Sequence, residues 1–549
     1  MSTTGYDYVV VGAGSAGCVI AARLSEDPSV RVLLVESGGR DWHPLFHVPA
    51  GFARMTKGIA SWGYATVPQR NMRNRRIWYT QARVLGGGST INAQVYARGH
   101  ASDYDGWAAL GCTGWAYEQV LPYFRRTEDN DTFDDELHGR GGPIGVSQPA
   151  STLPISEAFF AAAAQLGIPR IQDLAGRDTF GVGHYQVTQH HGRRSSAVSG
   201  YLRPARRRHN LDVRTNVTVS RLLIEGDRAQ GIELVGPTAG DVMQIRAERE
   251  IIVTAGTIGS AKLLMLSGIG PAGHLRTVGV RCIHDLPGVG SNLQDHLDVC
   301  VMCECTGEHT FDRYQQPYWA ALAGLQYLAT RGGPAASNLF ETGGFLRSSF
   351  TRGAPDIQFH LGLGSGIEAG IARLKNNGVT LNSAYMRPIS RGTVRLASDE
   401  PSAAPLIDPN YWDEPEDRHA SIEGLKMARS IMRQSALEPY VLAERTPGPA
   451  AKSDDDLEAY ACANAKTDHH PVGTCAMGTG SDAVVGPDLK LRGIEGLRVA
   501  DASIMPRIIS SNTNATVYMI AEKAADLIRG LGSSAVQSAG HAALSRAAT

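Results

Sequence analysis

The sequence predicts an α/β protein that begins with a strand–turn–helix–strand unit, and three observations support this prediction. Residues 8–11 are apolar and mostly β-branched, which is typical of a parallel strand buried on both faces. A glycine-rich stretch, 12–17, follows directly, and residues 18–24 are small, apolar and compatible with a helix. A second apolar run, 30–36, has the composition of another buried strand. Together these segments form a βαβ unit, which is the building block of a parallel sheet.

Length, composition and charge limit the class of protein. The chain has 549 residues, enough for about three to four average domains or for two large ones built from interrupted segments. Hydrophobic residues make up 42% and charged residues 19%, which excludes a largely disordered chain. The net charge of −1 provides no field for a polyanion, so we expect no nucleic-acid partner.

Cysteines and apolar runs bear on the cellular compartment. Eight cysteines in a chain of this length do not form a disulfide framework. The cluster Cys300-Val-Met-Cys303-Glu-Cys305 lacks a second ligand pair and alternates like a strand, so we expect no metal site there. No apolar run reaches the roughly 18 residues of a membrane span, and the N-terminus lacks a basic signal-peptide region. We therefore expect a cytoplasmic protein without a transmembrane segment, and leave a peripheral membrane contact open.

Weaker patterns indicate further elements along the chain. Strands are expected at 211–213, 249–253 and 356–360, and a helix is expected at 419–433. The last ordered element is expected at 516–527.

The first glycine-rich turn predicts a dinucleotide site. Gly12-x-Gly14-x-x-Gly17 joins a strand to a helix, where glycines permit a tight turn and a close approach of the backbone to a pyrophosphate. The helix N-terminus then favours the negative charge of the diphosphate. Glu36 ends the next strand, where a carboxylate accepts hydrogen bonds from an adenosine ribose and disfavours NADP. FAD and NAD both remain open at this stage.

A second glycine-rich segment favours FAD. The stretch Arg83-Val84-Leu85-Gly86-Gly87-Gly88-Ser89-Thr90-Ile91-Asn92 has few side chains, so it could lie flat against a large cofactor. The alternative is a flexible surface loop.

Six motifs in this order resemble those of the glucose-methanol-choline (GMC) flavoprotein oxidoreductases, over nearly the whole chain. They lie at 12–17, 83–99, 255–271, 288–296, 470–474 and 499–514. The resemblance implies a Rossmann-type FAD-binding domain and a substrate domain with an antiparallel sheet above the flavin, within an overall α+β arrangement. Segments 41–55 and 337–345 are most similar to bacterial FAD-dependent L-sorbose dehydrogenases, with alkanol, polyethylene-glycol and choline dehydrogenases nearby.

The resemblance also implies domain limits and cofactor contacts. The FAD-binding domain is expected at 1–155, 206–300 and 462–532, the substrate domain at 156–205 and 301–461, and a flexible tail at 533–549. Some members attach the flavin covalently through a histidine; the corresponding residue here is Ile91, so we expect non-covalent FAD. The residues expected to bind FAD are Gly12, Gly14, Ser15, Ala16, Gly17, Glu36, Ser37, Val84, Gly88, Asn92, Ala93, Val95, Val219, Asp501, Ala502 and Asn514.

The family pattern places the catalytic pair near the C-terminus, at His470 and Asn512. Oxidation of an alcohol requires removal of the hydroxyl proton as hydride leaves the carbon, and flavin N5 accepts that hydride. An imidazole, with an ordinary pKa of about 6.5, can take the proton near neutral pH if it lies within about 3 Å of the hydroxyl. Asn512 would hydrogen-bond the same oxygen and fix its orientation.

Three further residues are considered for a role in the site. His469 is the rival base, and we expect it to support His470 from behind, although the Asp468-His469-His470 run departs from the family's usual aromatic–histidine pair. His296 is expected to be structural. Glu341 could bind a substrate hydroxyl or cation, but a buried structural carboxylate is favoured.

These features predict an FAD-dependent dehydrogenase that oxidises a primary alcohol, polyol or sugar, with L-sorbose as the best candidate. A quinone or similar carrier is the expected electron acceptor. The alternatives are an aliphatic alcohol, polyethylene-glycol or choline dehydrogenase or oxidase, a redox-inactive lyase that resembles the hydroxynitrile lyases, and a non-catalytic NAD-binding protein.

Overall fold

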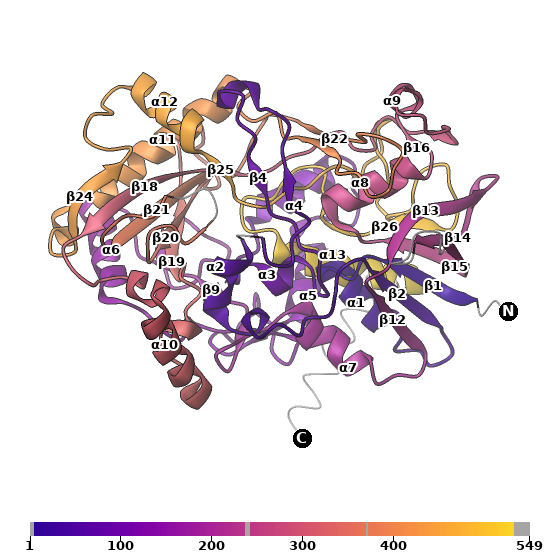
Figure 1. The fold of residues 1–549 in the computed structure, drawn as a ribbon, viewed down its shortest axis with the longest axis horizontal. Helices are drawn as coiled ribbons and strands as arrows, with labels where there is room; N and C mark the ends of the chain where they lie inside the picture. The colour runs from indigo at the N-terminus through magenta and orange to yellow at the C-terminus, as the bar shows by residue number, and fades with distance from the viewer. Residues whose placement is uncertain (1–4, 57, 236–241, 369–371, 532–549) are drawn as a thin grey trace.

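The computed structural model describes residues 5–56, 58–235, 242–368 and 372–531, which fold around two β-sheets (Figure 1). The expected tail at 533–549 lies outside the described residues. Of the helices within these ranges, none combines the length and the hydropathy needed to cross a bilayer.

The first sheet contains the predicted βαβ unit and is seven-stranded within the described residues. Its strands, from edge to edge, are β12 (Leu211–Thr215), β2 (Val32–Glu36), β1 (Tyr6–Val11), β15 (Val242–Val253), β14 (Arg228–Val235) and β13 (Thr218–Glu225), with β26 (Leu497–Val499) paired to β15. The five strands β12, β2, β1, β15 and β26 run parallel, whereas β13 and β14 are antiparallel. The strands predicted at 8–11, 30–36, 211–213 and 249–253 are confirmed, since each falls largely or wholly within one of these strands.

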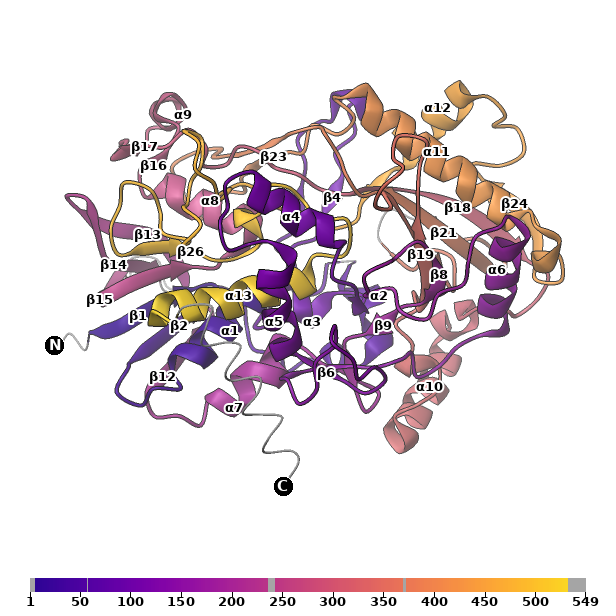
Figure 2. The same cartoon turned by 180° about the vertical axis from the view of Figure 1, so that it is seen from behind.

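Two helices from opposite ends of the chain pack together against this sheet. α1 (Ser15–Leu24) is buried along almost its whole length because α13 (Asn514–Arg529) lies over it (Figure 2). An ion pair between Arg23 and Glu522, at 2.8 Å, joins the two helices. The element predicted at 516–527 is therefore confirmed as a helix, and it completes the N-terminal unit.

The second sheet is antiparallel and is covered by α11 (Pro415–Met432), which confirms the predicted helix (Figure 1). In the described part of the chain its strand order is β19 (Thr342–Leu346), β20 (Ile357–Gly362), β21 (Gly378–Tyr385), β18 (Leu297–Cys305) and β24 (Val441–Thr446), with β25 (Lys466–Thr467) paired to β18. The cysteine cluster lies in β18, as its alternation predicted. β18 also spans residue 300, where a domain boundary was expected.

The two faces of this second sheet differ in polarity because side chains alternate along each strand. Ile357 and Ser383 face α11, where both lie next to Gly424. His360 and Asn382 are direct register partners on β20 and β21, and they occupy the opposite face. That face is polar, and it looks onto the cavity described below.

Shorter elements connect and cover the sheets. The remaining helices are α2 (Phe52–Met55), α3 (Gly88–Ile91), α4 (Ala101–Ala109), α5 (Tyr117–Thr127), α6 (Pro154–Gln165), α7 (Arg203–Ala205), α8 (Gly256–Leu266), α9 (Ala272–Thr277), α10 (Pro317–Thr330) and α12 (Asp454–Asn464). The short strands are β3 (Tyr64–Ala65), β4 (Trp78–Tyr79), β5 (Val95–Tyr96), β6 (Glu128–Asn130), β7 (Ile144–Val146), β8 (Gly181–His184), β9 (Gln186–Val187), β10 (Gln189–His190), β11 (Arg193–Arg194), β16 (Ile269–Gly270), β17 (His284–Asp285), β22 (Thr393–Arg395) and β23 (Leu406–Asp408).

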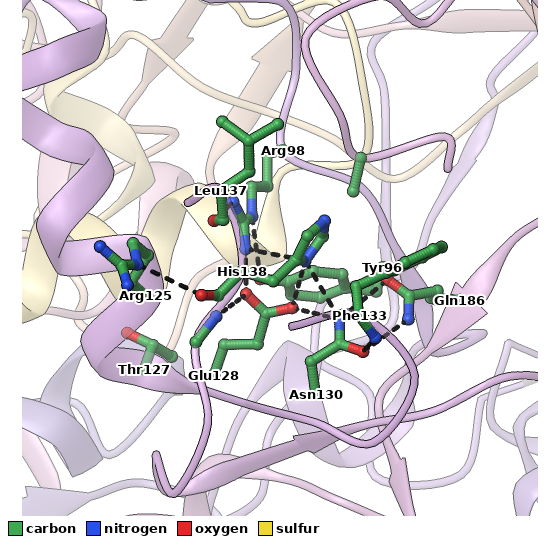
Figure 3. Close-up of polar contacts among 12 residues, drawn as sticks. Tyr96, Arg98, Arg125, Thr127, Glu128, Asn130, Phe133, Leu137, His138 and Gln186 are labelled. Atoms are coloured by element: carbon green, nitrogen blue, oxygen red, sulfur yellow. Dashed lines mark hydrogen bonds and ion pairs between the residues drawn. The ribbon is translucent and has the colours of Figure 1, made fainter. Parts of the chain in front are cut away.

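A largely buried ionic network fixes the segment that follows β5. Figure 3 shows four of its members, Arg98, Glu128, Asn130 and His138. The half-buried Asp173 is the fifth. Glu128 pairs with Arg98 and accepts hydrogen bonds from Asn130 at 2.6 Å and His138 at 2.9 Å. The other nitrogen of His138 lies 3.1 Å from Asp173. Burial opposes the charged form of His138, but the bonds to Asp173 and Glu128 prevail and raise its pKa to about 9. His138 is therefore a charged, fully paired structural group.

Candidate active site

A cavity lies between the carboxyl ends of β1, β2 and β15 and the polar face of the second sheet. Ligands of parallel sheets bind at this end of the strands. The predicted site residues that line the cavity are Gly12, Gly14, Ser15, Ala16, Glu36, Ser37, Val84, Gly88, Asn92, Ala93, Val95, Val219, His470, Asp501, Ala502, Asn512 and Asn514. Segments from both ends of the chain thus meet around one space.

Gly12 and Gly17 of the first turn must be glycine for different steric reasons. Gly12 has φ +101°, and an added Cβ would lie 2.5 Å from the Thr254 carbonyl oxygen at the end of β15. At Gly17 an added Cβ would lie 1.9 Å from the Gly12 carbonyl oxygen, so this residue lets α1 pack closely on the turn. Gly17 therefore supports the turn from behind.

Two other glycines leave room on the cavity side, as a bound dinucleotide requires. Within the described residues, a Cβ added to Gly88 would meet no atom within 4 Å, and one added to Gly14 would meet only the Thr254 oxygen at 4.0 Å. α1 begins at Ser15, and none of the described side chains caps its N-terminus. Its free N–H groups are thus available to an anion, and the space fits the pyrophosphate of FAD.

Glu36, expected near the adenosine ribose, and Val219, expected to bind FAD, both border the cavity. The Glu36 carboxylate accepts hydrogen bonds from the backbone nitrogens of Ala13, at 2.9 Å, and Gly38, at 2.7 Å. Burial raises its pKa, although these two bonds oppose the shift. A β-bulge follows Val219 on β13. Both residues border the same space, and a carboxylate with remaining lone pairs can accept from ribose hydroxyls.

Asp501 and Asn514 border the cavity at two further helix N-termini. The Asp501 carboxylate accepts from the Gly256 backbone nitrogen at 2.8 Å, from the Ser260 hydroxyl at 2.6 Å and from the Ser503 backbone nitrogen at 2.8 Å. The side chain of Asp501 thus anchors the start of α8. Asn514, the first residue of α13, accepts from the Ser15 hydroxyl at 2.7 Å and ties the two ends of the chain together at the glycine turn.

The second glycine-rich segment is ordered around a buried arginine and is not a surface loop. Asn92 accepts from Arg194 at 2.6 Å. Ile91, the position at which covalent attachment was considered, lies in the cavity wall and is 5% exposed. An isoleucine side chain offers no atom for a covalent bond to flavin.

The predicted catalytic pair is in contact. His470 Nε2 lies 3.2 Å from Asn512 Nδ2. Asn512 is oriented by Gln358 of β20, whose amide nitrogen donates to the Asn512 carbonyl oxygen at 2.9 Å. This bond turns the Asn512 NH₂ group toward His470, where it donates to Nε2.

The hydrogen-bond chain behind His470 fixes its tautomer. His296 Nε2 lies 3.2 Å from the Met386 carbonyl oxygen, which can only accept, so Nε2 carries the proton. His296 Nδ1 is therefore an acceptor, and His470 Nδ1 donates to it at 3.0 Å. As a result, the lone pair of His470 is on Nε2, on the Asn512 side. His296, which was expected to be structural, thus touches the base directly.

The electrostatic surroundings keep the base neutral. Burial, followed by the neighbouring imidazoles of His296, His360 and His469, lowers the pKa of His470 well below its ordinary value. A neutral imidazole at Nε2 is the form that can accept a proton.

The loop that carries His470 is held by Asp295. The Asp295 carboxylate accepts from the His470 backbone nitrogen at 2.9 Å and from the Thr467 hydroxyl at 2.6 Å, and it also binds the Tyr411 hydroxyl. These contacts stabilise a turn in which His469 has a left-handed φ of +62°. The side chain of His469 consequently lies in the cavity wall beside the base and does not support it from behind.

Sequence reasoning missed several residues of the cavity wall. His360, Asn382 and Glu368 line the cavity, but they reach it through strand register and a loop, without a local motif. Glu341 is completely buried and accepts from the Ser337 hydroxyl at 2.8 Å, as the structural interpretation implied.

Comparison with known proteins agrees with this geometry. Residues 6–298 and 388–521 match the N- and C-terminal family models of the GMC oxidoreductases. An alcohol dehydrogenase [acceptor] of Pseudomonas putida is 40% identical over 95% of both chains. The mitochondrial choline dehydrogenase of Homo sapiens is 41% identical over 96% of this chain and 90% of that protein.

A solved structure extends the agreement to three dimensions. An FAD-dependent oxidoreductase from Chaetomium thermophilum has a TM-score of 0.88 and 28% identity, over 96% of this chain and 99% of its own. The predicted resemblance is confirmed: the chain belongs to the GMC oxidoreductase family, and its cofactor is FAD.

Proposed function

We propose that this protein is a dehydrogenase that oxidises a primary alcohol, polyol or sugar, with non-covalent FAD and with His470 as the general base. L-sorbose is the first substrate to test, because segments 41–55 and 337–345 favour it. The observation that carries the proposal is the contact of a neutral His470 Nε2 with Asn512 on the wall of the FAD cavity.

The roles of the side chains follow from their donors and acceptors. When bound, FAD supplies the hydride acceptor. His470 Nε2 accepts the proton of the substrate hydroxyl, while the Asn512 NH₂ group donates to the same oxygen and holds it in place. His296 stabilises the resulting imidazolium, because its bare Nδ1 accepts from His470 Nδ1. Gln358 holds Asn512 in position, and Asp295 holds His470.

A quinone or similar carrier is the proposed electron acceptor, to which FAD, when bound, would supply the electrons. The Pseudomonas putida relative, which is named an alcohol dehydrogenase [acceptor], supports an acceptor of this type. We propose a cytoplasmic location and leave a peripheral contact with the membrane open.

Anaerobic mixing with candidate alcohols tests the proposal. L-sorbose, 1-butanol and choline are added separately to the holoenzyme without oxygen, and the visible flavin absorbance is followed. Bleaching by L-sorbose or 1-butanol is expected. Bleaching by choline alone would assign the activity of the human relative instead. Unchanged flavin with every alcohol, together with release of cyanide from a cyanohydrin, would show a lyase and overturn the dehydrogenase.

A further inference from the structure

The cavity wall next to the catalytic pair contains polar atoms that the protein itself does not satisfy. Within the described residues, His360 Nε2, Asn382 Oδ1 and both ring nitrogens of His469 are buried without a hydrogen-bond partner. All three residues line the cavity. Nearly all buried polar atoms in proteins are paired, so a group of unpaired atoms on one wall indicates a partner that comes with the ligand.

These three side chains are held on one wall by the backbone. His360 and Asn382 are register partners, with 6% and 2% of their surfaces exposed. His469 reaches the same cavity from the left-handed turn that Asp295 anchors. The sheet and the anchored turn therefore fix the positions of these three side chains at the cavity wall.

The chemistry of the wall matches a hydroxyl group. Burial lowers the pKa of His360 and of His469 to about 4, so each ring is neutral, with one donor and one acceptor nitrogen. The Asn382 oxygen adds another acceptor. A hydroxyl, which donates and accepts, can satisfy such a set, whereas an alkyl chain or a trimethylammonium group cannot.

A carboxylate that borders this wall is paired with a cation. Glu368 borders the cavity, but its carboxylate lies 3.0 Å from the buried ammonium group of Lys466. Lys466 also lies 2.7 Å from Asp298. Glu368 is thus committed to a lysine, which weakens its attraction for a cationic substrate.

We propose that His360, Asn382 and His469 form a subsite for a second oxygen atom of the substrate, so that the enzyme prefers a diol or polyol to the matching mono-alcohol. This inference rests on the proposed dehydrogenase function. It makes the sheet wall the determinant of substrate choice, whereas His470 and Asn512 act on the reacting hydroxyl.

The wild-type holoenzyme provides the first test, with an artificial acceptor and four substrates: 1-butanol and 1,2-, 1,3- and 1,4-butanediol. The kcat/KM of the best diol should exceed that of 1-butanol by about 5- to 150-fold, which is the range expected for one buried hydrogen bond. If every diol is equal to or poorer than 1-butanol, the subsite is refuted while the dehydrogenase function stands. If none of these four alcohols reacts and L-sorbose also leaves the flavin absorbance unchanged, the dehydrogenase function itself fails.

Variants then locate the effect. Asn382→Leu and His469→Phe keep the size of the side chain and remove the polar atoms, and each should lower the diol-to-butanol ratio of kcat/KM by about 5- to 150-fold. Ser383→Ala is the matched control, because its hydroxyl is also buried and unpaired among the described residues but faces Gly424 of α11. The ratio should not change in the control. A ratio that is unchanged in both wall variants, with normal flavin content, would overturn the assignment.

Discussion

Two buried histidine clusters in this molecule differ in almost every respect. His138, in the ionic network of Figure 3, has carboxylates at both nitrogens, and its pKa is raised. His470 Nδ1 lies 3.0 Å from a second imidazole and 3.4 Å from the carboxyl group of Asp468, whose pKa is raised by burial, and Nε2 lies next to an amide. The pKa of His470 is lowered. The first cluster is charged and saturated with partners, and the second is neutral and borders unpaired polar atoms.

The difference shows how the partners of a histidine determine its role. A carboxylate on each side stabilises the imidazolium, so His138 cannot gain a proton and can only hold the fold together. The neutral partners of His470 leave its Nε2 without a proton, so this nitrogen can accept one. Burial alone does not separate the two, because both side chains are buried.

The largest expected effect is on the neutral cluster. His470→Ala should lower kcat by about 10²- to 10⁴-fold, because the hydroxyl proton loses its acceptor. Steady-state kinetics with an artificial acceptor measures this, and flavin content and Tm should remain near those of the wild type. His191→Ala, at an exposed histidine, is the control and should keep full activity. A near-normal rate in His470→Ala would remove its assignment as the base.

A substitution in the charged cluster should lower the free energy of unfolding and leave kcat unchanged. Glu128→Gln keeps the shape but leaves Arg98 and His138 without their shared carboxylate, so unfolding should become easier by about 3–5 kcal/mol. Denaturant unfolding of the holoenzyme measures the change, and kcat per bound flavin should stay constant. Glu118→Gln, which breaks an exposed pair with Arg177, should change stability by less than about 1 kcal/mol. Equal effects in the two variants would contradict the comparison.

The stability that the charged cluster contributes should also depend on pH. The folded pKa of His138 is about 9, above its unfolded value of about 6.5, so its contribution is complete below pH ~6.5 and is lost as pH rises through ~9. The loss is on the order of 3 kcal/mol. The Tm difference between the wild type and His138→Gln should therefore shrink from pH 6 to pH 10. A difference that grows with pH would show that His138 is neutral in the native protein.

The smallest effect tests the tautomer of the base. His296→Leu removes the acceptor of His470 Nδ1–H, which leaves this buried donor with only the more distant Asp468 Oδ2, at 3.4 Å, and allows the proton to move to Nε2. We expect kcat to fall by about tenfold, within the range for one lost buried hydrogen bond. His296→Asn offers another acceptor and should restore part of the rate. If Leu and Asn behave alike, packing and not the tautomer is the cause.

The sequence predicted the parts of the site that are encoded locally. The turn at Gly12–Gly14 is recognisable because strand, glycines and helix follow one another within a few residues. His470 and Asn512 were identified only through the family resemblance, since the 41 residues between them hide their contact. Glu36 was placed correctly at the end of its strand because parallel strands align their carboxyl ends.

The rest depended on register between distant strands, which one sequence does not reveal. Asn382 faces the cavity because β21 pairs with β20 in one register, and a shift of one residue would turn it toward α11. The direction of His469 follows from a left-handed backbone angle that the histidine itself does not predict. The Gln294-Asp295-His296 run was recognisable in the sequence as a family motif. That the His296 side chain points toward His470 could be learned only from the fold.

The bond between Ser15 and Asn514 has a consequence for biosynthesis. The ribosome makes α1 among the first elements and α13 as the last described helix, so the outer surface of α1 stays uncovered until translation is nearly finished. A chain that terminates before residue 512 lacks α13, lacks Asn512 of the catalytic pair, and lacks the part of the cavity wall that Asn514 provides. Only chains that extend through α13 can therefore mature into working flavoprotein, and shorter products are left with an exposed apolar helix that favours degradation.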